Sequence, residues 1–151
     1  MTTANDSVAP PALTAPNAGT AMPPPPGLRV LCVDDNEDAA DSLGTILELV
    51  GCAVLVAHDA PTALAKVAEF APQVCVLDIT MPGMDGCELA RRLRELPGSE
   101  QQLLIALTAL GDYSSLERMA NAGFDLHFVK PMPPQELYAV LNRFADKGRP
   151  A

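Results

Sequence analysis

Five short apolar runs alternate along the chain with segments of helical periodicity, and this alternation constrains the fold more than any other feature. The runs hold four to six residues each, rich in Val, Leu, Ile or Phe, and they are 28–33, 53–57, 73–77, 103–107 and 126–129. Such runs are typical of strands that are covered on both faces. The segments between and after them predict helices over 37–50, 60–70, 86–96, 112–121 and 134–145. The order βαβαβαβαβα predicts one α/β domain, a doubly wound parallel sheet of five strands with helices on both faces.

The first 27 residues differ in composition from the rest of the chain. They are mostly Ala, Pro, Thr, Asn and Gly, and they include a run of four prolines at 23–26 and a single charge, Asp6. Such a segment cannot bury enough apolar surface to offset its ordering entropy. We therefore expect a disordered tail or linker over 1–27, removable without loss of stability, a folded domain over 28–147 and a short tail over 148–151. The alternatives are a ligand for a proline-binding groove and the linker of a hybrid kinase.

Charge and cysteine content narrow the function classes. Lys and Arg number 10 against 19 Asp and Glu, giving a net charge of −9. This acidity disfavours nucleic acid and anionic membranes as direct partners. The four cysteines form no CxxC pair, and neither a secretory signal nor an apolar run long enough to span a membrane is present. We expect a cytoplasmic protein with reduced cysteines.

Polar residues follow all five predicted strands, with His58 and Asp59 after the second. Asp34 and Asp35 follow the first, Asp78 the third, Thr108 the fourth and Lys130 the fifth. In open parallel sheets, ligands bind at the carboxyl ends of the strands. Clustered carboxylates repel one another, and a hard cation such as Mg²⁺ relieves that repulsion. With a Lys and a hydroxyl beside it, such a cluster predicts phosphoryl transfer to a carboxylate nucleophile.

Simpler interpretations exist for the charged residues of the helices. Asp38 and Asp41 are predicted only to favour the amino end of the first helix through its dipole. The three arginines of the third predicted helix are expected to form a solvated face, and they are Arg91, Arg92 and Arg94.

Four segments together resemble the receiver domain of two-component response regulators. They are 30–38 (VLCVDDNED), 76–86 (VLDITMPGMDG), 107–109 (LTA) and 128–131 (FVKP). The resemblance covers residues 28–146 and is greatest to the single-domain, chemotaxis-regulator type. It implies a flavodoxin-like strand order of 2-1-3-4-5.

The resemblance also implies a phosphoacceptor and a metal site. Asp78 would take a phosphoryl group from a phosphohistidine. The carboxylates of Asp35 and Asp78 and the carbonyl of Thr80 would bind Mg²⁺, or Mn²⁺ in its place, with Asp34 acting through water. Thr80 and Leu110 stand where relatives often carry other polar residues, which leaves the phosphoryl lifetime open.

Further roles follow from the same resemblance. Lys130, the Thr108 hydroxyl and the Ala109 N–H would bind the phosphoryl group, and the Lys130–Pro131 bond would be cis. His127 stands where relatives carry an aromatic switch residue, so Thr108 and His127 would form the switch.

The implied partners are a sensor histidine kinase or a histidine phosphotransfer protein, and a downstream protein. That protein would bind the surface of the fourth helix, fifth strand and fifth helix, or the chain would act as a phosphoryl shuttle or sink. Few residues follow the last helix, so we expect no output domain, and no enzymatic activity beyond the chain's own phosphorylation and dephosphorylation. One alternative is a Mg²⁺-dependent phosphohydrolase, whose signature requires an Asp in the place of Thr80. Another is an interaction module that is not phosphorylated, against which the complete site argues.

Overall fold

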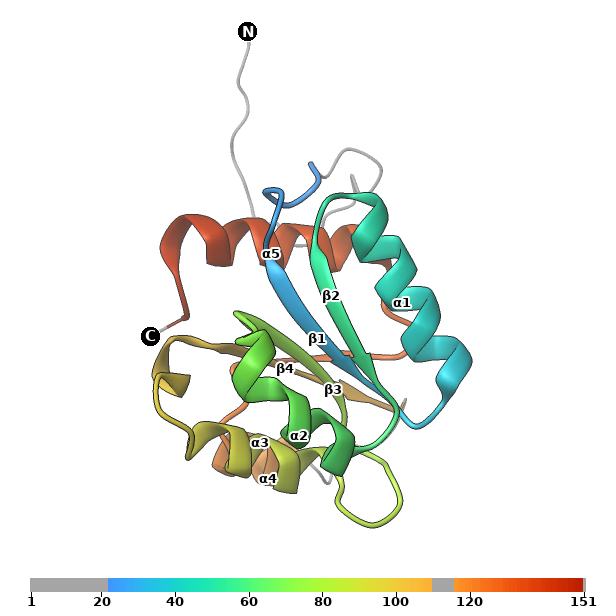
Figure 1. Cartoon of the computed structure of the whole chain (residues 1–151), viewed down its shortest axis with the longest axis vertical. Helices are drawn as coiled ribbons and strands as arrows, with labels where there is room; N and C mark the ends of the chain where they lie inside the picture. The colour runs from blue at the N-terminus through green and yellow to red at the C-terminus, as the bar shows by residue number, and fades with distance from the viewer. Residues whose placement is uncertain (1–21, 110–115, 151) are drawn as a thin grey trace, which may run out of the picture.

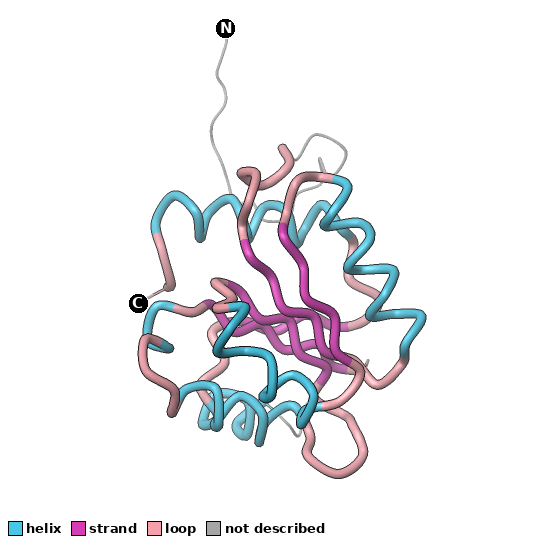
Figure 2. Tube along the Cα trace, viewed as in Figure 1, coloured by secondary structure: helices cyan, strands magenta, loops and turns pink. Residues whose placement is uncertain are grey.

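One parallel sheet of five strands forms the centre of the molecule. The computed structural model describes residues 22–109 and 116–150. The strands are β1 (Arg29–Val33), β2 (Ala53–Ala57), β3 (Val74–Asp78), β4 (Leu103–Thr108) and β5 (Leu126–Val129). They lie in the order β2-β1-β3-β4-β5, and every pair is parallel, so the predicted strand order is confirmed (Figures 1 and 2).

Helices cover both faces of this sheet. They are α1 (Glu37–Leu49), α2 (Ala60–Phe70), α3 (Gly86–Arg94), α4 (Leu116–Ala122) and α5 (Pro134–Lys147), with a 3₁₀ turn η3 (Ser99–Gln101) before β4. One buried cluster joins α2, α3 and α4 to the sheet, and a second joins α1 and α5 to the opposite face. The start of the predicted fourth helix, 112–115, lies outside the described residues.

The alternation of side chains along β1 explains why the sheet is covered on both sides. Leu31 and Val33 belong to the cluster under α2 and α3, whereas Val30 and Cys32 belong to the cluster under α1 and α5. Successive side chains of a strand point to opposite faces, so a continuous apolar run supplies both layers of the core.

The predicted solvated face of α3 is wrong for one of its three arginines. Arg91 and Arg92 are exposed and pair with Glu88. The Arg94 side chain is only 15% exposed and pairs with the buried carboxylate of Asp125, just before β5. Helical spacing places Arg94 toward the neighbouring 3₁₀ turn and the α4–β5 connection rather than toward solvent.

The amino-terminal part of the described chain lies against the domain. Residues 22–27 precede β1, and the Gly27 N–H donates to the Gly51 carbonyl at the α1–β2 turn. Residues 1–21 lie outside the described part, and the boundary between tail and domain at residue 27 stays a prediction.

Two further findings concern the cysteines and membrane crossing. All four cysteines are free and buried. Among the described residues, no helix combines the length and the apolar character that a membrane crossing requires.

Candidate functional site

Three carboxylates meet at the carboxyl edge of the sheet. Asp34 and Asp35 follow β1, and Asp78 is the last residue of the adjacent strand β3. Their ligand atoms all lie within 4.8 Å of one another. Asp34 and Asp78 are each 4% exposed, whereas Asp35 is exposed. The strand order therefore brings Asp78 to Asp34 and Asp35, from which more than forty residues separate it in the sequence.

Backbone groups fix the two buried carboxylates. The Asn36 N–H donates to Asp34 Oδ1 at 3.0 Å, and the Thr80 N–H donates to Asp78 Oδ1 at 3.1 Å. Gly86, the first residue of α3, approaches the backbone of Asp78 so closely that a Cβ atom there would collide with the Asp78 carbonyl oxygen. The β3–α3 loop is thus folded back on the strand end that presents Asp78.

Lys130 faces both buried carboxylates from the loop after β5. Its Nζ lies 3.2 Å from Asp34 Oδ2 and 3.4 Å from Asp78 Oδ2. The Lys130 N–H donates to the Thr108 carbonyl, and the Lys130–Pro131 bond is cis, as the resemblance implied. An ammonium in this position can neutralise a charged group bound between itself and the carboxylates.

The electrostatics of the site follow from burial and repulsion. Burial raises the pKa of Asp78 to about 6, and the charge of Asp34 adds to the rise, while the Thr80 N–H and Lys130 oppose it. Burial alone would lower the pKa of Lys130, but Asp78 and Asp34 outweigh it and raise that pKa. A carboxylate with an elevated pKa beside a charged partner is typical of functional sites.

Thr108 ends β4 at the same edge of the sheet. It is 3% exposed, and its hydroxyl donates to the Phe128 carbonyl at 3.4 Å. Ala109 follows it and is exposed, whereas Leu110 lies outside the described residues. Thr108 therefore ends the strand next to that of Asp78, and Ala109 directly follows it, at the edge where the sequence predicted them.

His127 is exposed on β5, in register with Ala106 of β4. Its neighbours Leu126 and Phe128 pack on the opposite face, in the cluster under α1 and α5. A cavity of about 140 Å³ lies beside His127 and is lined partly by α4. These positions are compatible with the predicted switch role, which stays a prediction.

Sequence reasoning missed two ion pairs near the site. His58 Nε2 lies 2.9 Å from Asp41 Oδ1, and this hydrogen bond raises the pKa of His58. Arg118 of α4 pairs at 2.7 Å with Asp85, whose side chain also caps α3. Both pairs join residues far apart in the sequence, so no local pattern could have revealed them.

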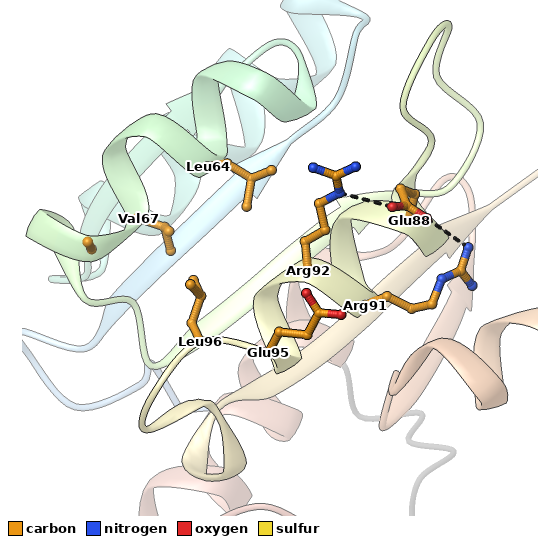
Figure 3. Close-up of a pocket in the computed structure, with 8 residues that line it drawn as sticks. Leu64, Val67, Glu88, Arg91, Arg92, Glu95 and Leu96 are labelled. Atoms are coloured by element: carbon orange, nitrogen blue, oxygen red, sulfur yellow. Dashed lines mark hydrogen bonds and ion pairs between the residues drawn. The ribbon is translucent and has the colours of Figure 1, made fainter.

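A shallow groove of about 660 Å³ lies away from the carboxylates, between α2 and α3 (Figure 3). Leu64, Val67 and Leu96 line it, and Arg91 and Arg92 border it. Both arginines are paired with Glu88, and none of the three site carboxylates lines the groove. The site described above is therefore separate from this groove.

The sheet order, the five flanking helices and the acidic edge define the flavodoxin-like fold of CheY-type proteins. Solved structures of similar proteins have the same fold. A CheY-like receiver domain protein from Methanospirillum hungatei JF-1 superposes with a TM-score of 0.73 and 30% identity, covering 80% of this chain and 95% of that one. A putative response regulator from Chloroflexus aurantiacus J-10-fl superposes with a TM-score of 0.71 and 31% identity, covering 79% and 98%.

The family model described as the response regulator receiver domain matches residues 30–142. The chain belongs to this family. Response regulator MprA of Mycobacterium avium (strain 104) is 35% identical over 123 residues, which cover 82% of this chain and 53% of MprA. This chain therefore spans about half the length of that relative. It is a receiver domain of the two-component response regulator type, with a role in signalling.

Proposed function

We propose that this chain is a phosphoacceptor of a two-component phosphorelay and that Asp78 carries the phosphoryl group. One observation supports this assignment above the others: Asp78 is buried at a strand end, beside Asp34 and Asp35, with the Lys130 ammonium 3.4 Å from its carboxylate. A nucleophilic carboxylate, a neighbouring cation and an acidic metal cluster are the parts that phosphoryl transfer requires.

The donor set suits Mg²⁺, or Mn²⁺ in its place. The available ligands are carboxylate oxygens within 4.8 Å of one another, and hard divalent cations prefer oxygen ligands. Asp35, Asp78 and the Thr80 carbonyl would hold the ion, with Asp34 acting through water. When bound, the ion supplies positive charge that offsets the carboxylates and the incoming phosphoryl oxygens.

The chain's own residues perform the transfer. A carboxylate oxygen of Asp78 attacks the phosphorus of a phosphohistidine, and an O–P bond forms as the P–N bond breaks. The electron pair of the broken bond stays on the imidazole nitrogen, and the product is an acyl phosphate. Lys130 donates hydrogen bonds to the phosphoryl oxygens, with the Thr108 hydroxyl and the Ala109 N–H as further donors.

The partners follow from this chemistry. The phosphoryl donor is a sensor histidine kinase or a histidine phosphotransfer protein, in the cytoplasm. The readout is a change in the surface of α4, β5 and α5, in which Thr108 and His127 move, or else the chain acts as a phosphoryl shuttle or sink. The chain catalyses only its own phosphorylation and dephosphorylation.

Intact-mass measurement after incubation with acetyl phosphate and Mg²⁺ tests the proposal. We expect one added phosphoryl group, which is lost in Asp78→Asn and in excess chelator. Asp38→Asn is the matched control, because Asp38 is an exposed acid of α1 outside the cluster. A phosphoryl adduct that persists in Asp78→Asn would refute the assignment. Beryllofluoride is a suitable second probe, since a similar structure, 28% identical, is the "BeF3 Activated DrrB Receiver Domain".

A further inference from the structure

A proline-rich arm, residues 22–27, lies at the amino edge of the sheet. Figure 1 shows this segment in blue before β1, on the side of the molecule where α5 crosses. The arm precedes the region that the family model matches, which begins at residue 30. It also lies at the edge opposite Asp78, because Gly27 and Gly51 come just before the starts of β1 and β2.

Two anchors hold the arm at its ends. At the first, the Asn142 side chain of α5 donates its Nδ2–H to the Met22 carbonyl at 2.8 Å. At the second, the Gly27 N–H donates to the Gly51 carbonyl at 2.8 Å. Pro26 packs on the same turn, since a Cβ at Gly51 would lie 3.4 Å from the Pro26 Cα.

Pro24 lies between the anchors and is buried, whereas Pro23 and Pro25 are exposed. One ring of the run therefore turns inward while its neighbours face solvent, as expected when an extended segment lies along a surface. Leu28 and Cys52, which directly follow Gly27 of the arm and Gly51 of the turn, belong to one apolar cluster with Tyr138 of α5.

The composition of the arm keeps the free-energy cost of docking low. A proline run is already stiff and extended, so it loses little conformational entropy when it docks. Proline also has no N–H group that burial would leave unpaired. The arm carries no charge, so it meets no repulsion from this acidic chain.

We propose that α5 and the α1–β2 turn form a binding surface for an extended proline-rich segment, occupied by the chain's own residues 22–27. The folded unit then begins at Met22 rather than at Leu28. Met22 then lies against α5, at the edge of the sheet opposite the phosphoacceptor. The arm's contacts share no residue with the phosphoacceptor site, although α5 also belongs to the proposed output surface.

Amide hydrogen exchange in the full chain, followed by NMR, tests this proposal. The reporter is the Gly27 amide, and Pro24→Gly and Asn142→Ala are the perturbing variants. Loss of one anchoring contact should raise the exchange rate of that amide about fivefold or more. The Leu31 amide of β1 should not change, which shows that the sheet remains folded.

Pro25→Gly is the matched control, because it removes the same ring and the same stiffness from an exposed position. Loss of stiffness alone should raise the Gly27 exchange rate by about two- to fivefold, and the rise in Pro24→Gly should exceed that of this control. An unprotected Gly27 amide in the parent chain would overturn the proposal. So would an unchanged rate in either perturbing variant, or an equal rise in the control. Acetyl phosphate labelling should be the same in all four proteins, so failure of the phosphoacceptor assignment would be seen separately.

Discussion

Replacement of Arg94 by Met tests how the α3, α4 and β5 segments are held together. The guanidinium donates to the Gly123 carbonyl twice, to the carbonyls of Ser99 and Gln102, and to Asp125 Oδ2, at 2.7–3.0 Å. Methionine keeps the apolar stem and removes every donor. The substitution therefore isolates the polar contacts from the packing.

The expected loss of unfolding free energy follows from the acceptors that the substitution leaves without a donor. The Asp125 side chain is 6% exposed, so it loses a charged partner in a poorly hydrated place. Asp125 keeps the Leu104 N–H and Arg149 as donors, which limits the loss. Breaking one partner of a buried pair costs about 3–5 kcal/mol, and we expect the lower end of that range. For a domain of this size the melting temperature should fall by about 10 °C.

Thermal and urea unfolding measure this change. Arg91→Met is the matched control, because Arg91 is exposed on the same helix and pairs only at the surface. It should alter the free energy of unfolding by no more than about 0.5 kcal/mol. Arg94→Lys should recover little, since a single ammonium cannot reach acceptors arranged around a planar guanidinium. If Arg94→Met and Arg91→Met lie within about 1 kcal/mol of each other, the reasoning is wrong.

Three further predictions concern the carboxyl edge. Because the pKa of Asp78 is raised to about 6, its ionisation destabilises the metal-free fold as the pH rises through that value. In chelator, Asp78→Asn should therefore be more stable than the parent protein at about pH 8 and should lose this advantage below about pH 4. Urea unfolding at the two pH values measures the difference. Lys130→Ala should raise the pKa of Asp78 further in an NMR titration, since Lys130 opposes that rise, and an unchanged pKa would contradict the contact. The imidazole signals of His127 should shift on addition of beryllofluoride, and His127 is a bystander if they stay fixed while the Thr108 amide moves.

The fold was predictable because its signal is local and repeated. Each strand is a short apolar run, and four of the five helices begin close to where their patterns begin, at residues 37, 60, 86 and 134. The site was predictable for a related reason. Parallel strands place their carboxyl ends at one edge, so residues such as Asp34, Asp78 and Lys130 converge once the strand order is known.

Other contacts join residues that no periodic pattern in the sequence relates to one another. Arg94 differs from Arg91 and Arg92 only in the groups that its side chain contacts. Its hydrogen-bond acceptors lie in loops up to thirty-one residues away in the sequence. Composition describes a whole segment, so it predicts the same disorder for the proline arm as for the rest of the first 27 residues. Its two anchors use the Met22 carbonyl and the Gly27 N–H. Because these are backbone groups, which every residue type but proline carries, the sequence does not mark them.

The charge balance of the site gives the strongest reason to expect phosphorylation to depend on a cation. Three carboxylates face one ammonium, so the fully ionised cluster is negative by two charges. Transfer to Asp78 replaces a carboxylate by an acyl phosphate, which adds negative charge in the same small volume. Lys130 is already shared between Asp34 and Asp78, so it cannot neutralise the added charge alone. Burial is the main cause of the elevated pKa of Asp78, and the charge of Asp34 adds to it before any phosphoryl group arrives. We therefore expect phosphorylation of Asp78 to require a divalent cation held by Asp35 and Asp78, and labelling by acetyl phosphate in excess chelator would contradict this expectation.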